Sequence, residues 1–164
     1  MKRAIAGLLA VVALAAGAGR ASAQGTLPVS FQVRLDAGLP IGDFKDATKA
    51  GLGWGVDAAF DVSPNFAVYG GYSSFDFDVR SSTVTVRDDG FDLGGRVLLG
   101  SGGGSLSTFG QFGALFHNGD TGFEVGLGGE YPVATAVTLT PLARFRKIGD
   151  TQYVGLGIGI SLRP

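Results

Sequence analysis

The last twelve residues, YVGLGIGISLRP, carry the most restrictive pattern in the sequence. Every even-numbered position from Val154 to Leu162 is aliphatic, and the positions between them hold only three glycines and Ser161. Strict alternation of this kind predicts a β-strand with one apolar face. Because a half-buried strand of a soluble protein carries polar side chains on its other face, the nearly empty second face needs a separate explanation.

The same alternation recurs along the chain. Segments such as FQVRLDAGL, LGWGVDAAFDV, FDLGGRVLL and FEVGLGGEY place apolar residues at every second position. Helical spacing fits none of them, and the 29 glycines argue against helices, since each would cost a helix about 1 kcal/mol. We expect eight strands, at residues 30–39, 51–62, 66–78, 90–99, 107–116, 122–131, 136–146 and 152–162.

The connections between these segments alternate in character. Polar stretches (PIGDFKDATKA, RSSTVTVRDD, HNGDT, KIGDTQ) alternate with small turns (SPN, GSGGGS, PVATA). An even number of strands joined in this way is typical of an outer-membrane barrel with short periplasmic turns and longer external loops. The predicted fold class is all-β: a closed antiparallel eight-stranded up-and-down transmembrane β-barrel.

The second face of the strands mixes glycines with isolated charges, which suits a crowded lumen. An eight-stranded barrel is only just wide enough for its own side chains, so long charged groups require nearly empty neighbours, such as the glycines of the last strand. Charges in so confined a space should pair, because an isolated buried charge is very costly. The predicted lumen ion network comprises Arg34, Asp57, Asp92, Arg96, Glu124, Glu130, Arg144 and Arg146, with Asp36 and Asp61 on the same face. A narrow, gated conduction path along the same residues is the alternative.

Segment 66–78 has apolar residues at both odd- and even-numbered positions, so its apolar face is not obvious. Placing Tyr69, Phe75 and Phe77 on the outer, apolar side puts Asp76 and Asp78 together on the inner side, and this is the arrangement we expect. A bulge at Gly70-Gly71 would exchange the two faces partway along the strand.

Strand length and aromatic residues agree with a membrane span. A strand of about 11 residues, rising about 3.3 Å per residue and tilted by about 40°, spans about 27 Å, close to the expected apolar band of about 25 Å. Aromatic residues fall near both strand ends, where interfacial belts lie. The predicted belt comprises Trp54, Phe91, Phe116, Phe123 and Phe145 at the loop ends and Phe31, Phe60 and Tyr131 at the turn ends. The competing interpretation is the aromatic core of a soluble, lipocalin-like barrel.

The N-terminus indicates export. Lys2 and Arg3 precede an apolar run, and Ala21 and Ala23 form an A-x-A cleavage pattern. We expect a signal peptide at residues 1–23, which carries the chain across the inner membrane and is cleaved, and a barrel domain at 24–164. A membrane anchor is disfavoured, because the run is short for a span of about 20 residues. Without Lys2, Arg3 and Arg20 the chain keeps 10 of 13 basic residues against 14 acidic ones, a formal charge of −4, so no nucleic-acid partner is expected.

Candidate chemistry is sparse, and we predict no enzyme, no catalytic, cofactor-binding or metal site, and no cofactor. His117 is the single histidine and has no serine near it in sequence, so we expect a solvated loop side chain. The carboxylates around Asp43 and Asp88 lack the spacing of an EF-hand. GSGGGS precedes neither Lys-Ser/Thr nor a helix, so it is a flexible turn and not a phosphate loop.

The signal sequence ending in ASAQ, the eight alternating segments and GLPIGDF at residues 38–44 resemble the small outer-membrane barrels: the OmpA membrane domain, OmpX, OmpW and opacity-type proteins. The resemblance covers residues 24–164 and rests on a generic pattern. The family usually ends on an aromatic residue, whereas this sequence ends on Leu162-Arg163-Pro164.

The resemblance implies the outer membrane of a Gram-negative-type envelope, a monomer surrounded by lipid and lipopolysaccharide, and the barrel-assembly machinery as a partner during biogenesis. It leaves four functions open. We favour a structural or surface-interaction barrel with a filled lumen. The alternatives are an OmpW-like narrow channel or small-molecule transporter, a soluble periplasmic binder, and a lipid-modifying enzyme using His117.

Overall fold

The computed structural model describes residues 29–101 and 106–163. The predicted signal peptide, residues 1–23, lies outside the described residues. Within the described part of the chain, no helix is both long and apolar enough to cross a membrane.

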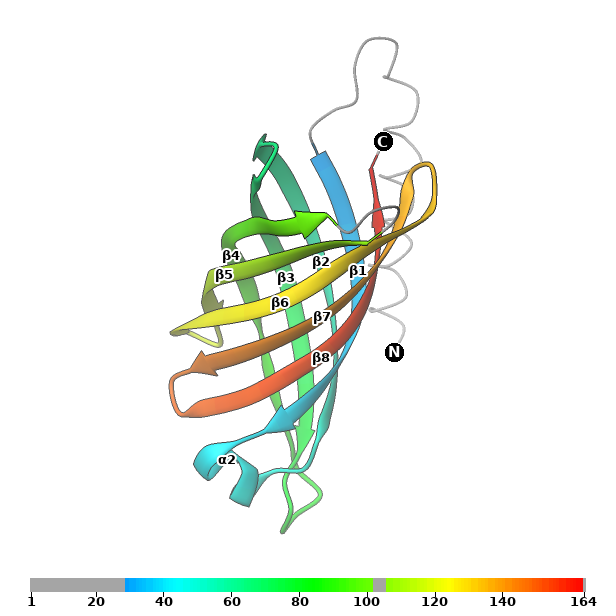
Figure 1. Cartoon of the computed structure of the whole chain (residues 1–164). Coiled ribbons are helices and arrows are strands. Elements are labelled where there is room, and N and C mark those ends of the chain that lie inside the picture. The colour runs from blue at the N-terminus through cyan, green and yellow to red at the C-terminus, as the bar shows by residue number, and fades with distance from the viewer. Residues whose placement is uncertain (1–28, 102–105, 164) are drawn as a thin grey trace.

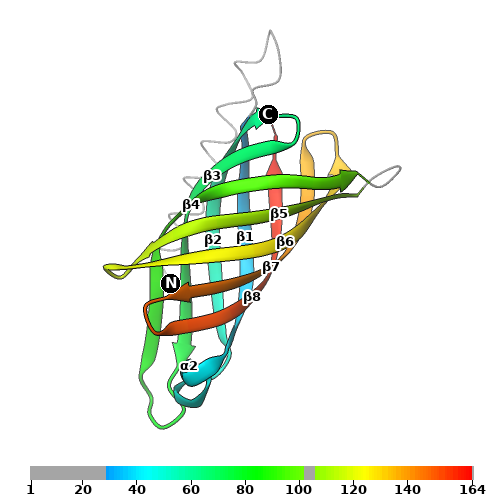
Figure 2. The same ribbon diagram turned by 60° about the vertical axis from the view of Figure 1, so that its left-hand side comes forward.

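Eight antiparallel strands close into one barrel in chain order, which confirms the predicted fold class. The barrel closes where β1 pairs with β8, from Phe31 opposite Leu162 to Pro40 opposite Tyr153. Figures 1 and 2 show the strands wound obliquely around a single cylinder. The strands are β1 (Val29–Pro40), β2 (Gly51–Ser63), β3 (Phe66–Asp78), β4 (Thr85–Ser101), β5 (Ser107–His117), β6 (Asp120–Ala134), β7 (Val137–Ile148) and β8 (Thr151–Leu162).

The two ends of the barrel differ. We call the end that carries the β1–β2, β3–β4, β5–β6 and β7–β8 connections the loop end, which is the lower end in Figure 1, and the opposite end the turn end. The β1–β2 connection, expected as irregular loop, contains the short helix α2 (Gly42–Ala47). β4 begins at Thr85, five residues earlier than expected, so the β3–β4 hairpin extends into the predicted loop, with Asp78 opposite Thr85.

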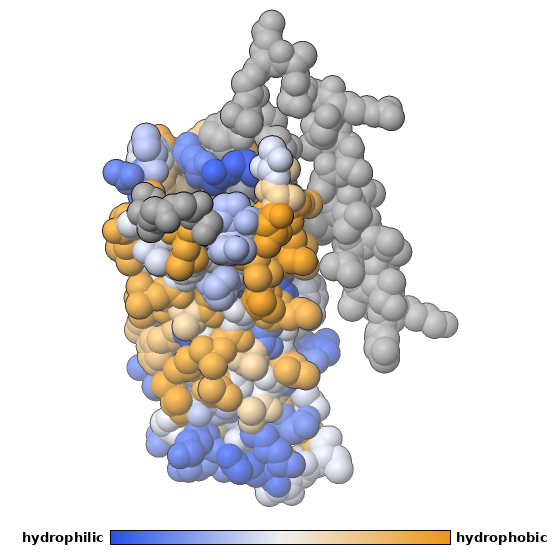
Figure 3. All heavy atoms as spheres, turned by 45° about the vertical axis from the view of Figure 1, so that its right-hand side comes forward, coloured by the Kyte–Doolittle hydropathy of each residue, from blue (hydrophilic) through white to orange (hydrophobic). Residues whose placement is uncertain are grey.

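Side-chain direction follows the alternation of the sequence. On β1, Arg34 and Asp36 are 3% and 4% exposed, whereas Leu35 between them is 66% exposed. On β8, Leu156 and Ile158 face outward and glycines face the lumen. Figure 3 shows apolar residues around the middle of the outer surface, with hydrophilic residues gathered at the lower end and others toward the upper end. The barrel therefore has a polar interior and an apolar exterior, the reverse of a soluble core.

The predicted orientation of β3 is wrong. Tyr69, Phe75 and Phe77 are at most 3% exposed and point into the lumen, whereas Asp76 lies on the outer surface. The β3 register is continuous through Gly70-Gly71, so the alternative, a bulge that exchanges the two faces there, is not found either.

The preceding hairpin sets the observed orientation of β3. The β2–β3 pairing shifts by one residue between Asp61 and Ser63. If the register set by the Ser63–Phe66 pair continued unchanged along the two strands, the inward-facing Asp57 would lie opposite Tyr72. Tyr72 would then face the lumen, and Tyr69 would face outward. With the shift, Asp57 faces Gly71. A slip of one residue moves every side chain of a strand to the opposite face.

Candidate functional site

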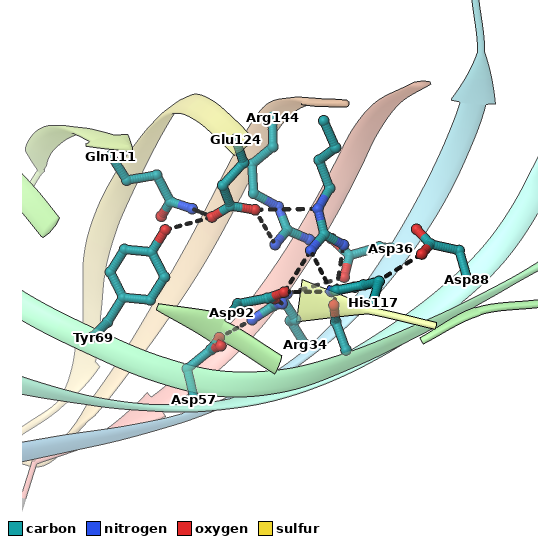
Figure 4. Close-up of polar contacts among 12 residues, drawn as sticks. Arg34, Asp36, Asp57, Tyr69, Asp88, Asp92, Gln111, His117, Glu124 and Arg144 are labelled. Atoms are coloured by element: carbon teal, nitrogen blue, oxygen red, sulfur yellow. Dashed lines mark hydrogen bonds and ion pairs between the residues drawn. The ribbon is translucent and has the colours of Figure 1, made fainter. Parts of the chain in front are cut away.

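The middle of the lumen is filled by arginines and carboxylates from five strands (Figure 4). Arg34 on β1 forms ion pairs with three aspartates. Its Nε lies 3.1 Å from Asp36 Oδ2, its Nη2 lies 3.2 Å from Asp92 Oδ2, and its Nη1 contacts Asp57. Because each partner comes from a different strand, this one guanidinium ties β1, β2 and β4 together across the lumen.

Two arginines of β7 complete the centre. Arg144 Nη2 lies 2.8 Å from Asp36 Oδ1, and its Nη1 lies 3.4 Å from Glu124 Oε2. Arg146 places Nη2 2.6 Å from Asp92 Oδ1 and Nε 3.2 Å from Glu124 Oε2. Both arginines are at most 1% exposed, so their charges are compensated by protein groups and not by bulk water.

His117, expected as a solvated loop residue, is fully buried at the end of β5. Its Nδ1 lies 2.8 Å from Asp88 Oδ1 and its Nε2 lies 2.7 Å from Asp92 Oδ1. Carboxylate oxygens only accept hydrogen bonds, and only an imidazolium has two N–H donors. The geometry therefore suits a charged His117, with Tyr153 donating to the other oxygen of Asp88 at 2.7 Å.

The count of charges points the same way. The fully enclosed network holds three arginines against five carboxylates, and an imidazolium brings the balance closer to neutrality. Its members are Arg34, Arg144, Arg146, Asp36, Asp57, Asp88, Asp92, Glu124 and His117.

Inward-facing glycines provide the space for these side chains. A Cβ built at Gly55 would lie 2.6 Å from Arg34 Cζ, and one at Gly159 would lie 2.7 Å from Gln32 Nε2. Real Cβ atoms are essentially never found this close to a neighbour. On the last strand, the absence of a side chain at Gly157 and Gly159 is thus explained by Asp36 and Gln32, which lie against them.

The loop end of the lumen is apolar. Phe75, Phe77, Leu115, Ile148 and Tyr153 form a buried cluster. Phe44 of α2 covers this cluster, with its ring centroid 5.1 Å from that of Phe77 in an edge-on arrangement. Backbone hydrogen bonds hold the cover in place: the N–H of Lys49 donates to the carbonyl of Asp78, and that of Arg80 to the carbonyl of Ala47. We call this set, with Phe44, the aromatic cap.

The turn end is more open. Arg96 on β4 lies 3.6 Å from Glu130 Oε1, and its guanidinium lies over the Phe109 ring at 4.3 Å. Gln111 separates Arg96 from the centre, accepting from Arg96 at 3.4 Å and donating to Glu124 at 2.7 Å. A cavity of about 360 Å³ begins here, which we call the mouth.

The eight aromatic residues predicted for the belt all project from the outer surface. Phe91, at 65%, is the most exposed of them, and Phe31 and Phe145 are half-buried. A residue that was not predicted joins them: Tyr72 contacts both Trp54 and Phe91, with ring centroids 5.8 Å and 5.5 Å away. The eight residues are Trp54, Phe91, Phe116, Phe123 and Phe145 at the loop end and Phe31, Phe60 and Tyr131 at the turn end.

The structure places all eight charged residues predicted for the lumen inside the barrel, each in an ion pair. Arg96 and Glu130 lie apart from the others, at the mouth. Sequence reasoning missed Asp88, His117, Tyr69 and Tyr153. The sequence contained a signal for His117, since it lies an even number of residues from Gln111 along the same strand and therefore points to the same, inner face.

Comparison with known proteins identifies the fold. No family model and no curated protein sequence matches the chain. The crystal structure of Neisserial surface protein A (NspA) superposes over 86% of this chain and 100% of its own, with a TM-score of 0.64 and 10% identity. The fold is that of the small outer-membrane barrels.

Two further structures agree. The N-terminal barrel of Pseudomonas aeruginosa OprF matches over 85% of this chain and 100% of its own, with a TM-score of 0.58 and 12% identity. A de novo designed transmembrane barrel matches over 85% and 98%, with a TM-score of 0.54 and 18% identity. At these identities the likeness is one of fold, and it confirms the resemblance drawn from the sequence.

Proposed function

We propose that this chain is a monomeric outer-membrane β-barrel with a structural or surface-interaction role, not a catalyst or an open pore. The observation that carries the proposal is the inverted polarity of the barrel. Apolar side chains such as Leu127 and Ile158 are more than half exposed, whereas Arg146 and Glu124 are at most 1% exposed. A contiguous apolar outer surface has no partner in water, but it matches acyl chains.

The filled lumen supports a role outside conduction. A solute crossing the barrel would meet the ion network and then the aromatic cap, and both would have to rearrange. The external surface of a small barrel is then what remains for function, in contact with lipid, lipopolysaccharide and whatever meets the loops. The barrel-assembly machinery is the partner we propose during biogenesis.

A catalytic role for His117 has little support. A lipid-modifying site would need the imidazole near the lipid interface, whereas this imidazole lies inside the barrel with both ring nitrogens bound to aspartates.

Two measurements test the proposal. In the first, membrane fractionation is combined with detergent gels, where a folded barrel should migrate differently before and after boiling. Recovery of the mature chain as a detergent-free soluble protein would refute the membrane assignment. In the second, purified protein is reconstituted into planar bilayers. We expect no steady openings, and a stable unit conductance would instead support the OmpW-like channel.

A further inference from the structure

The mouth at the turn end has the size and the lining of a small-molecule site. Its volume of about 360 Å³ falls in the range of about 300–1,000 Å³ typical of ligand pockets. Leu98 and Phe109, opposite each other on β4 and β5, contribute apolar walls, and the charged side chains are Arg96 with Glu130 and Arg163 with Asp61. Such sites combine an apolar lining with a few convergent polar groups.

Arg96 is a largely buried group of the mouth whose hydrogen bonding is incomplete. Its side chain is 11% exposed, and a guanidinium has five N–H donors. Nη2 donates one long hydrogen bond of 3.4 Å to Gln111, and Nη1 lies 3.6 Å from Glu130, beyond hydrogen-bond distance. Among the described residues, Nε has no hydrogen-bond partner. A guanidinium in this state favours an oxyanion, which it can bind through two parallel N–H donors.

The surroundings of Arg96 specify the rest of the ligand. The guanidinium lies 4.3 Å above the Phe109 ring, and the partly exposed Leu98 lines the mouth beside it, so an anion bound to Arg96 would bring its attached carbon skeleton against apolar surface. Deeper in the lumen, Tyr69 donates to Glu124 at 2.5 Å and Gln111 donates to the same oxygen at 2.7 Å. These contacts separate the mouth from the ion network, so a ligand would enter and leave from the turn end.

From this geometry we propose that the mouth binds small organic carboxylates with an aromatic or apolar body. The carboxylate pairs with Arg96 and the body packs against Leu98 and the edge of Phe109. Glu130 competes with the ligand for Arg96, because its carboxylate is the nearest anion to that guanidinium. The proposal concerns binding at one end of the barrel and does not depend on conduction.

Three probes of the same length test it on the folded full-length protein: 3-phenylpropionate, 3-phenylpropan-1-ol and 3-phenylpropan-1-amine. Amide chemical-shift titrations in micelles separate saturable binding from partition into detergent. We expect saturable shifts at the turn end with the acid, and affinities at least about tenfold weaker for the alcohol and the amine, since hydrogen bonds to a charged group are worth about 1.5–3 kcal/mol. Equal binding of acid and alcohol, or no saturation by the acid, would overturn the proposal.

Substitutions at Arg96 and at Glu130, its ion-pair partner, should change the affinity for the acid in opposite directions. Arg96→Gln should weaken binding of the acid about tenfold or more, and Glu130→Gln should tighten it by removing the competing carboxylate. Arg80→Gln, at the loop end, is the control and should leave the affinity unchanged. A merely structural role for Arg96 and Glu130 would not produce a gain in either variant. If Arg96→Gln fails to fold, Glu130→Gln decides the question, and unchanged or weaker binding contradicts the proposal.

Discussion

Replacing Arg146 by methionine tests whether the lumen network holds the barrel together. Arg146 is fully buried and lies 2.6 Å from Asp92 and 3.2 Å from Glu124, with further hydrogen bonds of 3.0 Å to Ser73 and Tyr153. Methionine fills much of the same space without charge, so the loss is mainly that of compensation for two buried carboxylates. Removing one partner of a buried ion pair costs about 3–5 kcal/mol. For a urea m-value of about 2 kcal/mol/M, the unfolding midpoint should fall by about 2 M.

The assay is reversible urea unfolding in phospholipid vesicles, followed by the fluorescence of Trp54, the single tryptophan of the chain. Arg87→Met is the matched control. Arg87 also forms an arginine–aspartate pair, 2.7 Å from Asp76, but its side chain is 63% exposed, and water and salt screen such pairs. We expect no resolvable shift of the midpoint for this variant. If Arg146→Met unfolds at the same urea concentration as Arg87→Met, the stabilising role of the network is refuted.

A double-mutant cycle separates the loss of compensation from the loss of packing. Adding Asp92→Asn to Arg146→Met removes one negative charge from the overcharged lumen, so the free energy of unfolding should recover part of the loss. The two substitutions should therefore be clearly non-additive, as expected for groups within one ion-pair network. Strict additivity would mean that the two side chains contribute independently.

Three other predictions use the same unfolding assay. Gly157→Ala should destabilise the barrel by about 1–3 kcal/mol, because the added methyl group would overpack against Asp36 of β1. Gly155→Ala on the same face should be tolerated, because no atom lies closer than 3.9 Å to its added methyl group. Equal effects of the two variants would contradict the inference that the glycines leave space for lumen side chains. In a bilayer, Ile158→Arg, near the middle of the outer face, should lower the free energy of unfolding by about 2–4 kcal/mol, and Gln152→Arg, at the loop end, should lower it by about 0–1 kcal/mol. If the two losses were equal, the outer surface would not face a membrane. His117→Leu removes the imidazole that bonds to Asp88 and Asp92 and should lower the urea midpoint of unfolding at neutral pH. A midpoint equal to that of the wild type would show that the imidazole is not needed for charge balance.

The fold and most of the lumen residues could be predicted from the sequence. In a closed barrel, odd- and even-numbered residues of a strand point to opposite faces, so the position of a residue along its strand decides whether it faces the lumen or the outside. On β1, β6 and β8 one parity is apolar and the other holds glycine, polar or charged residues, and on β7 the arginines share one parity, so Arg34, Glu124 and Arg144 could be placed inside without knowing the register. The pairings among them could not, because they depend on which strands face each other across the lumen.

His117 shows a different limit. Its parity places it with Gln111 on the inner face of β5, but its position next to a turn suggested a loop. The β5 strand extends through His117, and the turn consists of Asn118 and Gly119 with positive φ of 51° and 89°. Positions where the strand ends are the least certain in any sequence-based assignment, and here one such position carries a buried imidazole.

The error on β3 has a cause that applies to any small barrel. The rule that charged residues face inward holds only within the apolar band, because beyond it the outer face meets water. Asp76 lies beyond the band, exposed and paired with Arg87, while Phe75 and Phe77 fill the aromatic cap inside. At this depth the polarity of the two faces is reversed, and a parity assigned from the aspartates places the whole strand the wrong way round. A depth-dependent rule, polar inside at mid-membrane and apolar inside at a capped end, accounts for β3 and for the inward-facing Leu115 and Ile148 alike.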